Sequence, residues 1–402
     1  MKIKKIINDP VHGFISISSP LILEVINHSY FQRLRRIRQL GLAEFVYPGA
    51  IHTRFHHAIG AMHLMTIALD MLRNKGHFIS EQEYEAALLA ILLHDIGHGP
   101  FSHVLESVLL PNLNHEKMSL QVMYLLNEEF EGKLNLAIQI FEDTYSRHFF
   151  HQLVSSQLDM DRLDYLQRDV YFTGVVEGKV GFDRIIQMLD IVNDTIVVEE
   201  KGIYSIENFL NARRLMYWQV YLHKTTLSAE RMLIKIMKRA KDLWVNGYSL
   251  SITKNLEFFL NAENLSFAEI VRQFLTLDDY DIWANVKNWQ FEKDFILKTL
   301  CQMFLKRNLF RMEISSSPFS EAHILEKIEK IRNKLCFDQE EASFFWESST
   351  ISNAGYVSDA QNILIRHKND FLLDVTKASD LPNIEALCRV VTKHYFCYPR
   401  NL

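Results

Sequence analysis

The sequence predicts a mainly α-helical protein with a short β-hairpin and a small mixed α/β unit at its C-terminal end. Three observations carry this prediction. Apolar residues recur at helical spacing through most of the first 335 residues. Residues 194–204 (DTIVVEEKGIY) show the clearest hairpin pattern, with a turn near Lys201-Gly202. After about residue 343, short apolar segments typical of strands replace the helical pattern.

Composition limits the class of protein. Of the 402 residues, 48% are hydrophobic and 23% charged, which is ordinary for a globular protein of roughly two or three units. No apolar run reaches the roughly 18 residues of a membrane span, and the basic start of the chain lacks the apolar stretch of a signal peptide. We therefore expect a cytoplasmic protein without membrane contact. The net charge of −5 disfavours nucleic acid as a partner, and the four cysteines, which form no CxxC pair, are expected to be reduced.

Four elements are predicted in the first 80 residues: a strand at 14–18, a helix at 20–27, a loop at 41–53 and a helix at 54–72. Between them, residues 30–40 carry four arginines among apolar residues. A solvated amphipathic helix is the favoured interpretation, because arginine stems pack on apolar surface while their charged heads reach water. A phosphate-binding face is the alternative.

The remaining elements follow the same rules. Helices are predicted from Glu81, from His115 with Asn114 as N-cap, over 155–170 with Ser155 or Ser156 as cap, and over 205–222. Residues 228–335 are helix-rich, with breaks near Gly247 and Pro318. Strands are predicted at 343–346 and 362–366, and a helix or strand at 383–394. Three units are expected: residues 1–230, a helical extension at 231–335 and the α/β unit at 336–402.

The strongest functional feature is the stretch AALLAILLHDIGHGPFSH at residues 86–103. Its apolar run predicts a buried helix that delivers His94 and Asp95 to its end, where Gly97, Gly99 and Pro100 break it. The helix dipole favours a histidine there but disfavours an aspartate. Buried charges are normally paired or bound to a metal. Nine of the 17 histidines lie between residues 52 and 115, a clustering typical of metal sites.

A metal site can be assembled from three predicted helices. His57 lies in the first turn of one helix, and His94 and Asp95 end a second. Asp161 is the best fourth ligand, because it shares a helix face with Tyr165 and Asp169. Asp159 and Asp164 are interpreted as ordinary positions of an amphipathic helix. Two imidazoles and two carboxylates suit one divalent ion: Mn²⁺, Fe²⁺, Zn²⁺, Ni²⁺ or, less well, Mg²⁺.

The residues around these ligands indicate phosphate chemistry. A bound divalent ion lowers the pKa of water and polarises a phosphoryl group. His98, His103 and His115 suit general acid–base catalysis, and Arg54 suits bidentate phosphate binding. The residues therefore predict metal-assisted hydrolysis of a phosphate ester without naming the substrate. A second stripe repeats at helical spacing, with two interpretations open, core packing or a nucleotide-facing surface: Arg213, Tyr217, Tyr221 and Lys224.

Six motifs resemble, in order, the deoxynucleoside triphosphate triphosphohydrolase branch of the HD-domain phosphohydrolase superfamily: NDPVHG (8–13), FQRLRRIRQLG (31–41), YPGAIHTRFHHAIG (47–60), HDIGHGPFSH (94–103), NHE (114–116) and DMDRLDYLQRD (159–169). The resemblance covers about residues 1–230, is weak beyond, and includes no sterile-alpha-motif domain. It implies an HD-domain helical core that hydrolyses deoxynucleoside triphosphates to the deoxynucleoside and inorganic triphosphate. Two alternatives are an HD-domain phosphohydrolase acting on monophosphates or another ester, and a nucleotide-sensing module with little turnover.

The resemblance also implies roles for single residues. The metal ligands would be His57, His94, Asp95 and Asp161. The catalytic set would be Arg54, His98, His103, His115 and Asp169, with His98 or His103 protonating the leaving 5′ oxygen. Gln39 and Leu40 would border the deoxyribose where a 2′-hydroxyl lacks room, and sugar and phosphate contacts would come from Tyr165, Asp169, Arg213 and Tyr221. Tyr217 departs from the family pattern.

The family further implies a homodimer or homotetramer with an activating nucleotide bound between subunits. Residues that match such an activator site are Lys5, Gln32, Arg35, Val46, His223 and Lys224. Asn27 stands where the family pattern has an aspartate, which puts guanine-nucleotide activation in doubt.

Overall fold

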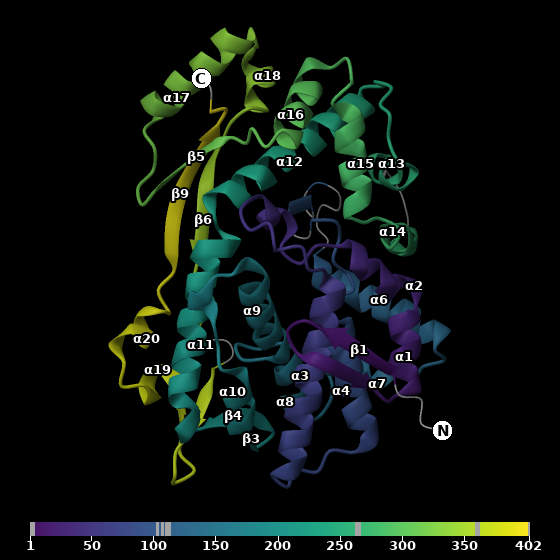
Figure 1. The fold of residues 1–402 in the computed structure, drawn as a ribbon, viewed down its shortest axis with the longest axis vertical. Coiled ribbons are helices and arrows are strands. Elements are labelled where there is room, and N and C mark those ends of the chain that lie inside the picture. Colours follow the sequence, from purple (N-terminus) through teal and green to yellow (C-terminus); the bar gives the residue numbers. More distant parts are fainter. Residues whose placement is uncertain are drawn as a thin grey trace.

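The computed structural model describes residues 5–101, 104, 105, 108, 114–261, 267–357 and 362–400. The described part is mainly α-helical, which confirms the predicted fold class (Figure 1). A two-stranded antiparallel hairpin, β1 (Lys5–Asp9) with β2 (Gly13–Ile17), precedes the helices. None of the described helices combines the length and apolar character needed to cross a membrane.

Three helices form the centre of the N-terminal part of the chain. The helix α3 (Arg54–Asn74) packs against both α4 (Glu81–Leu93) and α9 (Met160–Thr173). The apolar run of α4 is buried, as predicted, so the residues that follow it lie in the interior. α9 approaches α3 closely because Gly60 lacks a side chain. A Cβ at that position would lie 2.1 Å from both Asp164 Oδ1 and Arg168 Nη2.

Further helices surround this centre (Figure 1). Those before residue 224 are α1 (Pro20–Asn27), α2 (Ser29–Arg33), α6 (His115–Glu129), α7 (Asn135–Phe141), α8 (Phe149–Val154), α10 (Phe182–Met188) and α11 (Ile203–Met216), with short 3-10 turns η1 (Leu34–Arg36), η2 (Gly41–Phe45), η3 (Val176–Gly178) and η4 (Glu200–Gly202). A π-helical turn, η5 (Tyr217–Tyr221), leads to the long helix α12 (Lys224–Val245). Beyond it come α13 (Lys254–Leu260), α14 (Phe267–Phe274), α15 (Asp279–Trp289), α16 (Phe295–Leu305), α17 (Glu321–Leu335), α18 (Gln339–Ser343), α19 (Val375–Ala378) and α20 (Pro382–Ala386).

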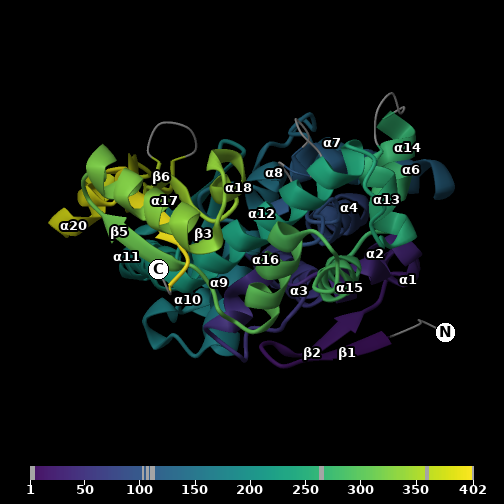
Figure 2. The same cartoon turned by 90° about the horizontal axis from the view of Figure 1, so that it is seen from above.

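Two sheets join distant parts of the chain. In the first, β4 (Thr195–Glu199) pairs antiparallel with β3 (Leu189–Val192) and parallel with β7 (Leu364–Arg366), which pairs with β8 (Leu372–Asp374). In the second, β9 (Val391–Tyr398) runs antiparallel between β5 (Arg311–Ser315) and β6 (Glu347–Asn353). Figure 2 shows β5, β6, α17 and α18 gathered at one end of the molecule, away from β1 and β2. Strands of the expected unit 336–402 thus pair with strands of each of the other two, and the division into units stays a prediction.

The predicted hairpin lies in the wrong place. Its turn is at Asn193 and Asp194, between β3 and β4, and both residues have positive φ angles. Asparagine and aspartate tolerate this left-handed conformation better than other non-glycine residues, so they determine the turn. Lys201 and Gly202 instead belong to η4, which leads into α11.

Three further local predictions need correction. Residues 343–346 are not a strand, because α18, which a capping box between Asp338 and Glu341 starts, ends at Ser343 and is followed by a turn at Phe344 and Phe345. The cap of α9 is neither Ser155 nor Ser156 but Asp159, whose Oδ1 accepts a hydrogen bond from the Arg162 amide at 2.7 Å. Residues 30–40 are not one solvated helix: α2 and η1 end at Arg36, and residues 37–40 are not helical. Residues 383–394 contain both a helix, α20, and the start of β9, while 362–366 includes β7 as predicted.

Candidate metal centre and cavity

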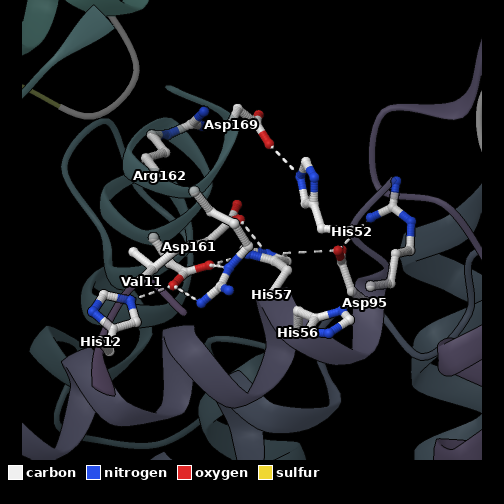
Figure 3. A network of polar contacts seen from close by, with 12 residues as sticks. Val11, His12, His52, His56, His57, Asp95, Asp161, Arg162 and Asp169 are labelled. Atoms are coloured by element: carbon white, nitrogen blue, oxygen red, sulfur yellow. Dashed lines mark hydrogen bonds and ion pairs between the residues drawn. The ribbon is translucent and has the colours of Figure 1, made fainter. Parts of the chain in front are cut away.

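Side chains from α3, α9 and the end of α4 converge on one point (Figure 3). The atoms His57 Nε2, His94 Nε2 and an Asp161 carboxylate oxygen all lie within 4.8 Å of one another. Asp161 Oδ1 is 3.0 Å from His57 Nε2 and 3.5 Å from His94 Nε2. Asp95 joins them, with Oδ1 3.4 Å from His94 Nε2 and Oδ2 3.7 Å from His57 Nε2. The structure therefore brings together the four residues that the sequence suggested as ligands.

The donor atoms of this group fit a divalent cation. His57 Nδ1 lies 2.8 Å from Asp164 Oδ2, and His94 Nδ1 lies 2.6 Å from the Ile91 carbonyl oxygen. When each Nδ1 donates its proton to these acceptors, each Nε2 presents a lone pair toward the other, at 3.4 Å. Two lone pairs and two carboxylates repel one another unless a cation lies among them. A His-His-Asp group of this kind could hold a metal ion.

The pKa shifts report the same concentration of negative charge. Burial disfavours the charged form of His57, yet hydrogen bonds with Asp161 and Asp164 raise its pKa to about 10. Burial acts to raise the pKa of Asp161, but hydrogen bonds with His57 and His94 bring it well below its ordinary value. The carboxylates therefore stay ionised at neutral pH and attract positive charge to this point.

Asp164 contacts the His57 ring at Nδ1, the nitrogen that does not face the other candidate ligands. Its interpretation as an ordinary position of an amphipathic helix is therefore wrong. It is fully buried and accepts hydrogen bonds from Arg168 Nε and Nη2, both at 2.9 Å. His12 Nε2 lies 2.7 Å from its Oδ1, and Arg168 also binds Asp9. This network fixes the orientation of the His57 ring, as outer-shell carboxylates do for metal ligands. The spacing of Asp164 and Arg168, four residues apart in one helix, was the available sequence signal.

A cavity of ≈ 350 Å³ opens beside the centre. Its lining includes many of the residues singled out from the sequence: Gln39, Leu40, Arg54, Asp95, His98, His115, Asp161, Tyr165, Asp169 and Tyr221. Lining residues that the sequence analysis did not assign include Arg162, Thr226 and Glu230, and Tyr217 also lines it. Arg162 follows the candidate ligand Asp161 directly, which was its only sequence signal. His103 lies outside the described residues.

Two histidines and an arginine lie together at this cavity. The rings of His98 and His115 have centroids 4.1 Å apart, and His98 Nδ1 lies 3.2 Å from Asp95 Oδ1. The Arg54 guanidinium forms an ion pair with Asp95. The loop that carries His98 approaches α6 closely because Gly97 has no side chain. A Cβ at Gly97 would lie 2.1 Å from the Ser119 amide nitrogen in α6. The site thus combines imidazole groups able to transfer protons with a cation able to bind phosphate.

Another wall of the cavity is built around Asp169. His52 Nε2 lies 2.8 Å from Asp169 Oδ1, and the Tyr221 hydroxyl donates to Asp169 Oδ2 at 2.8 Å. His52 is buried and stacks on Phe172 at 4.5 Å between centroids, a role that no sequence pattern predicted. Tyr221 belongs to the π-helical turn η5, a rare conformation that occurs frequently at functional sites. Arg213 is not part of the described cavity lining and instead donates to Gln157 Oε1 at 2.9 Å.

The six activator-site candidates are not part of this cavity lining. Gln32 Oε1 accepts from Arg35 Nε at 2.9 Å, and the Arg35 guanidinium lies 3.6 Å from the centroid of the Phe55 ring. His223 caps α12, and Lys224 lines a second cavity of ≈ 450 Å³ together with Arg311 and Arg400. Lys5 and Val46 lie in β1 and directly after η2. Their assignment to an activator site stays a prediction.

Comparisons with known proteins place the site in a family. The family model of the HD domain matches residues 54–169, and that of an HD associated region matches residues 180–249. The uncharacterized protein YwfO of Bacillus subtilis is 37% identical over 321 residues, which cover 77% of this chain and 71% of that protein. A Dictyostelium discoideum protein named deoxynucleoside triphosphate triphosphohydrolase SAMHD1 homolog is 32% identical over 251 residues, 58% of this chain and 48% of that protein.

A solved structure has a similar fold over almost the whole length of this chain. The crystal structure of a phosphohydrolase from Bacteroides thetaiotaomicron is 48% identical, with a TM-score of 0.95, and the match covers 99% of this chain and 100% of that chain. The candidate ligands His57, His94, Asp95 and Asp161 all fall within the matched HD domain. This chain therefore belongs to the family of HD-domain phosphohydrolases.

Proposed function

We propose that the protein hydrolyses deoxynucleoside triphosphates to the deoxynucleoside and inorganic triphosphate, using one divalent metal ion. The observation that carries the proposal is the convergence of His57 Nε2, His94 Nε2 and Asp161 Oδ1 beside a cavity that also presents Arg54 and Arg162. Metal ligands next to two guanidinium groups suit a polyphosphate better than a neutral substrate. The similarity to a protein named deoxynucleoside triphosphate triphosphohydrolase supports the substrate class.

The chemistry of the candidate ligands restricts which metal ions the site would bind. His57, His94, Asp95 and Asp161 offer two imidazole nitrogens and two carboxylates, which favour Mn²⁺, Fe²⁺, Zn²⁺ or Ni²⁺ over Mg²⁺. Such an ion, when bound, provides a water of lowered pKa and polarises a phosphoryl group.

The chain's own residues supply the remaining chemistry. Arg54 and Arg162 offset the negative charge of the phosphates, and Asp95 holds Arg54 in place through their ion pair. The leaving 5′ oxygen takes a proton from His98 or His103, and His115 packs against His98 to restrict its orientation.

The sugar is bound on the neighbouring wall. Gln39 and Leu40 border the deoxyribose, where close contact excludes a 2′-hydroxyl. Tyr165, Tyr221 and Asp169 contact its other side, with Asp169 oriented by the buried His52.

One assay tests this function. Purified protein with Mn²⁺ is given the four deoxynucleoside triphosphates, the ribonucleotides and the monophosphates, and the products are separated by chromatography. Release of inorganic triphosphate from deoxynucleotides supports the proposal. Pyrophosphate or single phosphate as product indicates a phosphohydrolase of another specificity. Tight nucleotide binding without turnover indicates a sensing module instead.

The proposal includes a homodimer or homotetramer with an activating nucleotide at the activator-site candidates. Lys224, Arg311 and Arg400 line one cavity and give it positive charge suited to phosphate. Light scattering with and without dGTP measures the subunit number. An assembly that stays monomeric in both conditions contradicts this part of the proposal.

A further inference from the structure

One wall of the cavity serves neither the metal centre nor the acid–base histidines. The helix α12 forms this wall and packs against η2. Thr226 and Glu230, four residues apart on α12, both line the cavity. Gly41 and Ala43 of η2 line it too, and neither has a side chain large enough to cover these polar groups. The wall therefore carries polar residues beside the cavity.

Among the residues that the structure describes, these polar groups have no hydrogen-bond partner. Thr226 is 2% exposed, and its Oγ1 makes no hydrogen bond. Gln39 Oε1, which lines the same cavity, is also buried and unpaired. Glu230 is half-buried, and no ion pair or hydrogen bond of its carboxyl is found among the described residues. A buried polar atom without a partner is destabilising, so Thr226 Oγ1 and Gln39 Oε1, beside the half-buried Glu230 carboxyl, indicate that a bound ligand supplies hydrogen-bond partners here.

The cavity is continuous from the metal side to this wall, since Asp161, Arg54 and Glu230 all line it. If the proposed function holds, the phosphates lie near Asp161 and Arg54. The sugar then lies at Gln39 and Leu40, and the base extends toward α12. We propose that Glu230 and Thr226 form a nucleobase-reading subsite that favours guanine among the deoxynucleotides.

The hydrogen-bond donors and acceptors on the edges of the bases explain the preference for guanine. An ionised carboxylate offers two neighbouring acceptors and no donor. Guanine offers two neighbouring donors, N1–H and N2–H, and so can bind a carboxylate through two parallel hydrogen bonds. Adenine and cytosine offer one donor beside an acceptor, and thymine offers one donor between two carbonyl oxygens. Burial raises the pKa of Glu230 to about 7, although Arg231 opposes this, so the carboxylate form predominates at about pH 8.

The substitution Glu230→Gln tests the subsite, because it replaces one acceptor by a donor and preserves the shape. We measure kcat/KM for dGTP and dATP at about pH 8 in one preparation of each protein, so a misfolded fraction does not alter the ratio. The dGTP/dATP ratio is expected to fall about tenfold, the discrimination of one bidentate base contact. Glu207→Gln is the matched control, since this buried α11 carboxylate accepts from Ser379 Oγ at 2.5 Å outside the cavity lining.

A second pair of variants separates the effect of the Thr226 hydroxyl from the effect of altered packing in α12. Thr226→Val removes the unpaired hydroxyl and is expected to lower kcat/KM for dGTP a few-fold. Ser228→Ala alters a buried hydroxyl on the same helix that donates to the Phe310 carbonyl oxygen, and should leave the base ranking unchanged.

The outcomes distinguish this inference from the proposed function. If triphosphate is released but the Glu230→Gln protein keeps the wild-type base ranking, the subsite is wrong and the proposed function stands. If no deoxynucleotide is hydrolysed, the proposed function fails and equilibrium dialysis with dGTP and dATP decides the subsite. A dGTP preference in binding that Glu230→Gln abolishes supports it, and equal affinities in both proteins overturn it.

Discussion

The Arg33 guanidinium donates from Nη2 to the carbonyl oxygen of His98, at 2.9 Å. Its Nε also donates to the Leu277 carbonyl oxygen at 2.8 Å, and the side chain is fully buried. Asp279 continues the connection, because its Oδ1 accepts from the Phe101 amide at 2.9 Å and its Oδ2 from the Arg38 amide at 2.8 Å. Residues 277–279 therefore hold in place the loop that carries His98, which gives the region beyond residue 231 a role in positioning the site.

Replacing Arg33 by methionine should weaken both fold and activity. The change leaves the His98 and Leu277 carbonyl groups buried without donors, so we expect the free energy of unfolding to fall by about 3 kcal/mol. kcat should fall as well, because His98 loses its support. Urea unfolding and assays at a temperature where the variant stays folded measure the two effects. Arg35→Met, at an exposed position, is the control, and equal stability of the two variants contradicts the role of Arg33.

Asp161→Ala should remove the metal. The change deletes one carboxylate from the converging group and leaves His57 and His94 without the neighbouring charge. Elemental analysis should show metal content falling from about one ion per chain to near zero, with loss of activity. Asp183→Ala alters an exposed aspartate and should keep both. A variant that loses Asp161 but retains full metal content would mean that Asp161 is not a metal ligand.

His98→Gln should separate metal binding from proton transfer. His98 lies beside Asp95 but is not among the converging ligand atoms, so metal content should match the wild type. Loss of a general acid should lower kcat by about 100-fold or more. His148→Gln, at a half-exposed position outside the cavity lining, is the control. Metal loss in the His98 variant shows that this residue is a ligand.

Gly60→Ala should be strongly destabilising despite its small size. The added Cβ would lie 2.1 Å from Asp164 Oδ1 and Arg168 Nη2, so this buried ion pair, or α9 with it, must shift away from α3. We expect a loss of about 3 kcal/mol or more and weaker metal binding, since Asp164 orients His57. Gly181→Ala has no heavy atom within 4 Å of the new Cβ and should cost less than about 1 kcal/mol. Comparable melting temperatures for the two variants would contradict the packing argument.

The pH dependence of stability should expose the role of Glu83 in α4. Burial acts to raise the pKa of Glu83, but hydrogen bonds from Arg147 and Ser80 lower it to about 2. Its folded pKa lies below the unfolded value, so its stabilisation is present above about pH 4.5 and is lost as the pH falls toward 2. Glu83→Gln should therefore cost about 2 kcal/mol near pH 7, and the difference from wild type should vanish toward pH 2. Urea unfolding across this range measures it, with the exposed Glu81→Gln as control. A difference that does not vary with pH contradicts the charge argument.

Some of the site followed from local patterns. The apolar run of α4 indicated burial on all sides, and burial made His94 and Asp95 at its end unusual enough to suggest a metal. Asp161 was reached through the face it shares with Tyr165, which also lines the cavity. Periodicity worked here because each inference concerned side chains on one helix.

Other residues of the site could not be predicted from the sequence, and the reason is the same for each. His12 and Asp164 are 152 positions apart yet their side chains meet at 2.7 Å. The run Leu163-Asp164-Tyr165-Leu166 looks the same in sequence whether Asp164 faces solvent or a buried arginine. Thr226 and Glu230 likewise look like ordinary helix residues until η2 is seen to leave a cavity beside them.

The sequence by itself determined the mainly α-helical class, the buried helix α4 and the types of side chain available for a metal and for phosphate. Those properties depend on hydrophobic period and residue chemistry, which are local. Only the tertiary structure decided that Asp164 supports His57, that Arg33 holds the His98 loop and that Arg213 is absent from the described cavity lining. These depend on which helices pack together, and a single close approach at Gly60 can determine that without leaving a periodic signal.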